Sequence, residues 1–92
     1  MTLKIGIVGD FNPQFHTHPA IERALWHAAD RVAVGIEARW VPTPSVTREN
    51  AVEVLSSYDG VWLSPGSPYK SMEGALESVR FARERNWPFV GT

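Results

Sequence analysis

The sequence contains no cysteine. Within these 92 residues, that absence excludes disulfide bonds, thiolate metal sites and a cysteine nucleophile, and it is compatible with the reducing cytosol. Long apolar runs are also missing, because no stretch approaches the roughly 18 residues of a membrane helix. The apolar start MTLKIGIVGD is not followed by a small-residue cleavage site. We therefore expect a cytoplasmic protein without a membrane partner.

An excess of charge of either sign is lacking as well. Nine Lys and Arg residues stand against ten Asp and Glu residues, the formal net charge is -1, and no basic stripe follows the chain. Proteins that bind nucleic acid neutralise phosphates with clustered basic residues, so nucleic acid is not expected as a partner. With 43% hydrophobic residues, the composition is that of a small globular domain. Its core should be thin, because a chain of this length buries only roughly 60 to 65% of its unfolded surface.

The apolar pattern predicts strands and helices in strict alternation. Strands are expected at 4–9, 36–41, 61–63 and 88–92, and helices at about 19–32, 48–57 and 71–86. This order calls for a parallel sheet with right-handed crossovers and helices on both faces. We predict an α/β fold of the three-layer, flavodoxin-like kind, with about four strands and three helices. Residues 1–92 would form one incomplete domain.

Individual residues refine these boundaries. Pro42 and Pro44 directly follow the second strand, which favours a place near an edge of the sheet. Thr17 or His18 is a candidate cap for the first helix, and Thr47 for the second.

Two loops are candidates for a binding site, because ligands of open α/β sheets bind beyond the carboxyl ends of the strands. They span residues 9–18 and 64–71. In the second loop, Gly66 permits a backbone geometry closed to other residues, and the N–H groups of Gly66 and Ser67 could form a concavity for an anion or oxyanion. The alternative interpretation of Pro-Gly-Ser-Pro is ordinary turn chemistry.

The first loop offers His16 and His18, which could bind a metal together with Asp10. We favour the alternative that both imidazoles are solvated or cap the helix, and we expect no metal. His18 and Glu22 could form a catalytic pair, but an acid in the first helical turn is the favoured interpretation. Gly9 is followed by no further glycines at dinucleotide spacing and no Walker motif exists, so no cofactor is expected.

Four aromatic residues are unusual in so small a domain, and they are Trp26, Trp40, Trp62 and Phe81. Trp26 and Phe81 fall off the main apolar stripes of their helices. They could cover something beyond this chain, or the helices could have broad apolar faces, and the pattern does not decide between these. An exposed apolar face would favour a homo-oligomer.

Taken together, several stretches resemble the N-terminal half of a class I glutamine amidotransferase domain, closest to that of CTP synthase. They are KIGIVGDF, AIERALWHAA, RWVPT, YDGVWLSPGSP and EGALESVRFARERNWPFVGT. The resemblance implies that Gly66 and Ser67 form an oxyanion hole and that Gly66, Ser67 and Pro68 contribute to a pocket for glutamine or a related amide. This chain departs from the family where a second glycine and an aromatic residue usually stand, at Ser67 and Pro68. Proline cannot donate a backbone hydrogen bond.

The resemblance also places Gly91 and Thr92 just before the family's cysteine nucleophile, with its histidine and glutamate later still. We therefore expect the chain to be a truncated, inactive part of a pyrimidine-biosynthesis enzyme that releases ammonia from glutamine in its full-length form. A UGA codon read as selenocysteine would supply the nucleophile, which would make the full product a selenoprotein. The alternative is a stand-alone, non-catalytic binding or dimerisation module of flavodoxin-like shape.

Overall fold

The computed structural model describes residues 1–65 and 69–92. Its elements in chain order are β1 (Thr2–Val8), α1 (Thr17–Val32), β2 (Gly35–Val41), the 3-10 turn η1 (Thr43–Ser45), α2 (Ala51–Leu55), β3 (Gly60–Leu63), α3 (Met72–Arg85) and β4 (Phe89–Gly91). The predicted alternation of strands and helices is confirmed. No helix within these two ranges is long and apolar enough to cross a membrane.

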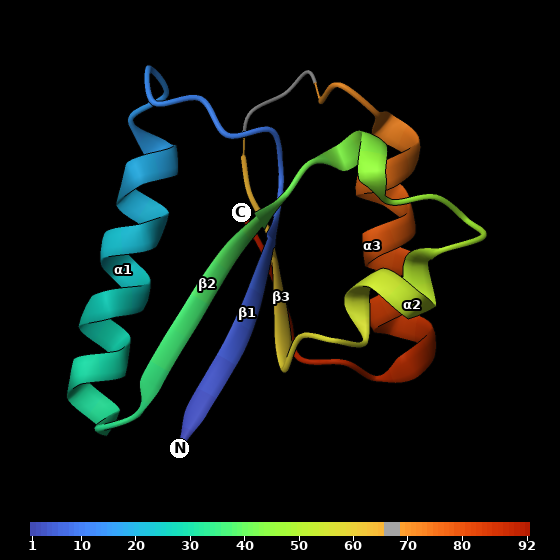
Figure 1. Ribbon diagram of the computed structural model, residues 1–92. Helices are drawn as coiled ribbons and strands as arrows, with labels where there is room; N and C mark the ends of the chain where they lie inside the picture. Colours follow the sequence, from blue (N-terminus) through green and yellow to red (C-terminus); the bar gives the residue numbers. More distant parts are fainter. Residues whose placement is uncertain (66–68) are drawn as a thin grey trace.

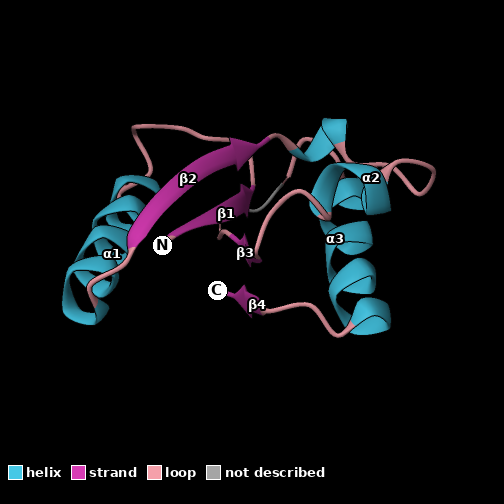
Figure 2. Cartoon of the chain, turned by 60° about the horizontal axis from the view of Figure 1, so that its bottom comes forward, coloured by secondary structure: helices cyan, strands magenta, loops and turns pink. Residues whose placement is uncertain are grey.

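All strand pairs are parallel, and the sheet has the order β2-β1-β3-β4. In β1, Ile5 pairs with Ala38 of β2 on one side and with Gly60 of β3 on the other. The placement of β2 at an edge is confirmed. The helix α1 lies on one side of the sheet, and α2 and α3 lie on the other (Figures 1 and 2). The predicted incomplete, flavodoxin-like α/β fold is therefore confirmed.

The central strand β1 feeds both faces of the sheet, because successive side chains of a strand point to opposite sides. Val8 belongs to a cluster on the side of α2 and α3, together with Val41, Val46, Ala51, Leu55, Val61 and Phe81. Its neighbour Ile7 belongs to a smaller cluster on the side of α1, together with Ile21 and Leu25. The thin core is thus divided into two unequal parts.

The first helix begins earlier than expected and without a side-chain cap. Its N-cap residue is His16, which makes no capping hydrogen bond, so the prediction of Thr17 or His18 as cap is wrong. The His18 side chain is bound elsewhere. Pro19 lies in the first turn, where a missing N–H costs nothing. The helix ends at Val32, and the left-handed backbone of the C-cap residue Ala33 (φ 57°) accompanies hydrogen bonds from its N–H to the carbonyls of Ala29 and Asp30.

The second helix, Ala51–Leu55, is shorter than predicted, and side-chain hydrogen bonds around Asn50 hold the turn that precedes it. Asn50 Oδ1 accepts a hydrogen bond from Thr47 N at 2.7 Å, and its Nδ2 donates to Ser45 O at 3.0 Å. Thr47 Oγ1 accepts from Asn50 N at 3.2 Å, within a turn that precedes the helix. This reciprocal pair is the hydrogen-bond pattern of a capping box. The residue before the first residue of α2 is Asn50, which makes no side-chain capping bond, whereas Thr47 caps the turn that leads into the helix, as predicted.

Candidate functional site

The loops that follow β1, β2 and β3 meet at the carboxyl edge of the sheet, at the top of Figure 1. The predicted oxyanion and substrate residues Gly66, Ser67 and Pro68 lie outside the described residues. The residues on either side of them are described, and their contacts show how this edge is built.

Asp10, the second residue after β1, is the central acceptor of this edge. Its Oδ1 accepts from Thr43 N at 2.9 Å, and its Oδ2 accepts from Thr43 Oγ1 at 2.8 Å and from Lys70 N at 2.8 Å. Thr43 Oγ1 in turn accepts from Ser71 N at 2.9 Å. One carboxylate therefore joins the end of β1, the turn after β2 and the segment that leads into α3.

These donors determine the charge state of Asp10. Burial by itself would raise the pKa of Asp10, but the hydrogen bonds from the Lys70 and Thr43 N–H groups and from the Thr43 hydroxyl, with the positive charge of Lys70, lower it below its ordinary value. Asp10 is thus ionised at neutral pH. Its function in the structure is to hold three loops together.

His18 is the second organising residue, and it is almost completely buried, with 1% of its surface exposed. Its Nδ1 accepts from Asn12 N at 2.9 Å, and its Nε2 lies 2.9 Å from Pro65 O. A backbone N–H can only donate and a carbonyl can only accept, so the ring is neutral and carries its proton on Nε2. The expectation of a solvated or capping imidazole is wrong for His18. It holds for His16, which is exposed.

Aromatic rings surround the His18 imidazole. The ring centroids of Trp40, Phe15 and Phe11 lie 4.9, 5.3 and 6.0 Å from it. Both ring nitrogens are already bonded within this cage. In the part of the chain that the structure describes, His, Asp and Glu side chains form no group of three that could hold a metal ion. Asp10, His16 and His18 are therefore not brought together as a metal site.

Glu22 is bound to a different partner from the one considered. Its Oε1 accepts from the indole Nε1 of Trp40 at 2.8 Å, whereas the two nitrogens of His18 are bonded to Asn12 and Pro65. Glu22 and His18 therefore do not form the hydrogen bond of a catalytic pair. The interpretation as a first-turn acid is also wrong, because α1 begins at Thr17 and its first turn holds no acidic residue. Glu22 instead links the second turn of α1 to β2.

The residues on both sides of 66–68 are anchored. Before this segment, the buried Ser64 donates from Oγ to Pro65 O at 3.1 Å. After it, the Tyr69 hydroxyl donates to Ser64 O at 2.7 Å, and Ser71 Oγ accepts from Gly74 N at 3.1 Å as the cap of α3. Just after β1, a Cβ at Gly9 would overlap Ser64 Oγ, so the Ser64 side chain lies directly against the Gly9 backbone.

The sequence could have indicated part of this network. Thr43 follows β2 as Asp10 follows β1, and polar residues beyond neighbouring parallel strands meet at one edge. The contribution of Tyr69 had no such signal, because its partner is a backbone carbonyl.

The four aromatic residues have different environments. Phe81 is buried and packs against Trp87, with ring centroids 5.3 Å apart, so the broad apolar face of α3 explains it. Trp40 and Trp62 are half-buried, and Trp26 is 56% exposed on α1. Trp62 lines two shallow apolar hollows between α1 and the strands β3 and β4, of about 280 and 220 Å³. Among the described residues, α1 borders this part of the sheet and no second helix covers it.

No protein-family model matches the sequence. It is 34% identical over 89 residues to CTP synthases of several Staphylococcus aureus strains, including JH9, Newman and JH1. The match covers 97% of this chain but 17% of each of those enzymes. Over nearly all of its own length, the chain is thus similar to a short segment of CTP synthase.

Proposed function

We propose that this chain is a segment of a CTP synthase-like glutamine amidotransferase, whose full-length form hydrolyses the amide of glutamine and supplies ammonia for pyrimidine biosynthesis. The observation that carries the proposal is the 34% identity to CTP synthase over 97% of the chain. The architecture supports it, because Ser64, Pro65 and Tyr69, the described residues that flank 66–68, lie at the carboxyl edge of the sheet, where open α/β sheets bind their ligands.

The proposed role of this segment is to stabilise charge. When a nucleophile attacks the amide carbon, the carbonyl oxygen becomes an oxyanion, and the N–H groups of Gly66 and Ser67 would bind it. Pro68 would line the glutamine pocket without donating a hydrogen bond. The anchors at Pro65, Tyr69 and Asp10 would hold these donors in advance of the reaction.

The same chemistry explains why the 92 residues by themselves should be inactive. An oxyanion hole lowers a barrier only when a nucleophile and a base are also present. The sequence has no cysteine, and the buried His18 uses both ring nitrogens for structure. The nucleophile, a cysteine or selenocysteine directly after Thr92, and its activating residues would belong to a continuation of the chain.

The proposal is tested on the native gene product. The gene is expressed with its natural downstream sequence, the mass and C-terminal peptides of the product are determined, and ammonia release from glutamine is measured for the product and for the 92-residue chain. We expect glutaminase activity in a product larger than 10.3 kDa and none in the 92-residue chain. A native product of 10.3 kDa, or ammonia release by the short chain, would overturn the proposal.

A matched pair of variants in the active product tests the oxyanion loop. Ser67→Pro removes the backbone N–H, whereas Ser67→Ala removes only the hydroxyl. Loss of one oxyanion donor lowers kcat by about 100- to 1,000-fold in comparable sites. We expect such a loss for Ser67→Pro and a change of only a few-fold for Ser67→Ala. Equal activity of the two variants would exclude Ser67 N–H as a donor.

The uncovered part of the sheet favours a second candidate function, a non-catalytic module that dimerises through this face. Val90 on β4 is 52% exposed beside the hollows that Trp62 lines. Exposed apolar surfaces of this kind promote association. Sedimentation of the chain should show self-association that Val90→Lys weakens, whereas Leu76→Lys, a similarly exposed site on α3, should leave it unchanged. A chain that stays monomeric at high concentration would exclude this function.

A further inference from the structure

His18 is a buried titratable side chain for which the proposed chemistry has no use. Its two hydrogen bonds join Asn12, in the loop after β1, to Pro65, which follows β3 and lies 47 residues from His18 in the sequence. The ring lies between the loop that precedes α1 and the segment that enters residues 66–68. It therefore connects the loops after β1 and β3 through a single imidazole.

We propose that His18 is a positioning residue that works as a pH-dependent clasp, closed in its neutral form and opened at Asn12 by protonation of Nδ1. The clasp itself is a property of this chain. Its significance for a binding site rests on the proposed function, because the segment that begins at Pro65 is the proposed oxyanion loop.

The two bonds respond differently to a proton. In the neutral ring, the Nδ1 lone pair accepts the Asn12 N–H. Protonation places an N–H at Nδ1, so two donors would face each other and the bond to Asn12 is lost. The Nε2–H donor to Pro65 O is retained, and the positive charge strengthens it. Acidification should thus release the loop after β1 while the link to Pro65 persists.

The surroundings offer the charged ring no compensating carboxylate. The titratable groups on the elements around it are Asp10 and His16 in the loop after β1, Glu22, Arg23, His27, Asp30 and Arg31 on α1, Glu37 and Arg39 on β2, and Tyr69 and Lys70 before α3. Within residues 1–65 and 69–92, none of them has a hydrogen bond or ion pair to the imidazole. Glu22 is bound by Trp40, Asp10 by Thr43 and the Lys70 N–H, and Glu37 pairs with Arg39 at 3.7 Å. A protonated ring gains hydration only if the loop opens to water.

The clasp is tested by ¹⁵N NMR of the 92-residue chain as a function of pH. At pH 8, the ring ¹⁵N shifts of His18 should show a proton on Nε2 and none on Nδ1. Hydrogen exchange of the Asn12 amide, expressed relative to its intrinsic rate at each pH, should be slow at pH 8. We expect its protection to fall at least tenfold in step with the titration of His18. The Lys70 amide, which is bonded to Asp10, should keep its protection over the same range.

Two variants distinguish loss of the His18 hydrogen bonds from a general loss of stability of the chain. His18→Phe keeps a ring in the aromatic cage but removes both hydrogen bonds, so Asn12 should be unprotected at every pH and the pH step should vanish. His27→Phe removes an exposed histidine of the same helix and should leave the step unchanged. The amide of Ile7 in the central strand should stay protected in both variants and reports the intact sheet.

Three results would overturn the proposal. They are a neutral His18 with its proton on Nδ1, Asn12 protection that does not follow the His18 titration, and a pH step that persists in His18→Phe. If His18→Phe does not fold, the tautomer and the Asn12 titration in the unmodified chain decide alone. None of these measurements uses glutamine, so the clasp and the proposed function can fail independently.

Discussion

The two faces of the sheet are covered to very different extents. The face toward α2 and α3 buries a cluster of seven hydrophobic residues, whereas the face toward α1 buries a cluster of three. The cause is topological. The crossovers from β2 to β3 and from β3 to β4 run in the same direction, so their right-handedness places α2 and α3 on one side and leaves α1 alone on the other. Helix amphipathicity alone would not reveal this asymmetry.

The largest expected effect comes from a matched pair of leucines. Leu55 on α2 is fully buried in the larger cluster, and Leu25 on α1 is 9% exposed beside an open hollow. Truncation removes transfer free energy and leaves a cavity whose cost depends on how well the site can relax. We expect Leu55→Ala to lower the free energy of unfolding by about 3 to 5 kcal/mol and Leu25→Ala by about 2 kcal/mol. Urea denaturation at pH 7 measures both, and equal losses would show that the two faces are packed alike.

A second pair adds atoms instead of removing them. We call the face toward α2 and α3 the crowded face and the face toward α1 the open face. A Cβ at Gly74 of α3 would overlap Thr43 O on the crowded face, whereas Ala24 of α1 borders a hollow on the open face. Overpacking costs about 1 to 3 kcal/mol, and the helix propensity of alanine returns up to about 1 kcal/mol. Gly74→Ala should therefore destabilise the chain, and Ala24→Leu should leave it unchanged or more stable. Thermal unfolding ranks the two, and a stabilised Gly74→Ala would mean that α3 can move away from Thr43.

The sequence predicted the architecture because the fold depends on local patterns. The apolar run of residues 4–9 indicated the strand β1, and the prolines after β2 indicated an edge of the sheet. The polar network was only partly predictable. His18 was interpreted from its neighbours in sequence, but its environment is set by Trp40 and Pro65, which lie 22 and 47 residues away. Local propensity carries no information about such partners.

Asp10 supplies the third prediction, because it holds the turn that α3 of the crowded face packs against. Asp10→Asn should destabilise the chain by about 1 to 2 kcal/mol at pH 7. Both carboxylate oxygens of Asp10 accept hydrogen bonds, whereas the asparagine amide is uncharged and has one oxygen that accepts and one NH2 group that only donates. The folded-state pKa of Asp10 lies below its ordinary value, so its contribution is fully present above the unfolded pKa of about 3.9 and is lost as the pH falls through the folded pKa.

The measurement is the difference in urea midpoint between the native chain and Asp10→Asn from pH 7 down to pH 2.5. The difference should be constant at the upper end and shrink below about pH 4. Asp30→Asn, a change at an exposed aspartate of α1, is the control and should show no comparable trend. A pH-independent difference would mean that the geometry of the site, and not its charge, accounts for the effect.

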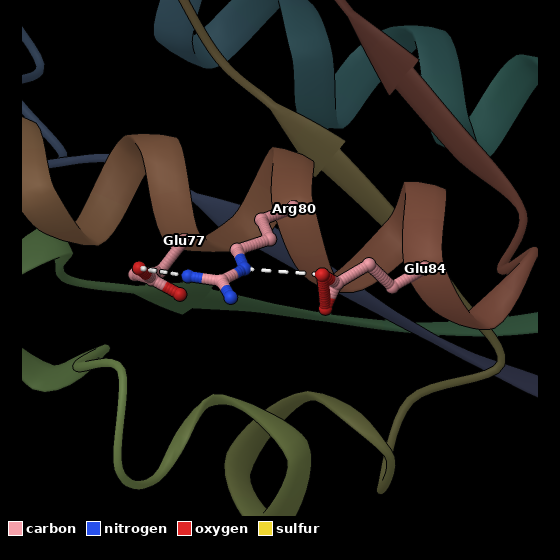
Figure 3. Close-up of polar contacts among 3 residues, drawn as sticks. All are labelled: Glu77, Arg80 and Glu84. Carbon is pink, nitrogen blue, oxygen red and sulfur yellow. Dashed lines mark hydrogen bonds and ion pairs between the residues drawn. The ribbon is translucent and has the colours of Figure 1, made fainter.

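The smallest effect is expected on the outer surface of the crowded face, where Arg80 lies between Glu77 and Glu84 on α3 (Figure 3). Its Nε donates to Glu84 Oε2 at 3.1 Å, and its Nη1 lies 3.7 Å from Glu77 Oε1. The hydrogen bond to Glu84 and then the charges of both carboxylates raise the pKa of Arg80, but the guanidinium is charged throughout the physiological range in any case.

Exposed ion pairs contribute little because water and salt screen them and ordering long side chains costs entropy. Arg80→Gln should consequently leave the urea midpoint unchanged in low and high salt, although the adjacent Phe81 is buried in the core. A salt-dependent loss as large as that of Leu25→Ala would mean that charge pairs, and not only buried apolar area, distinguish the two faces.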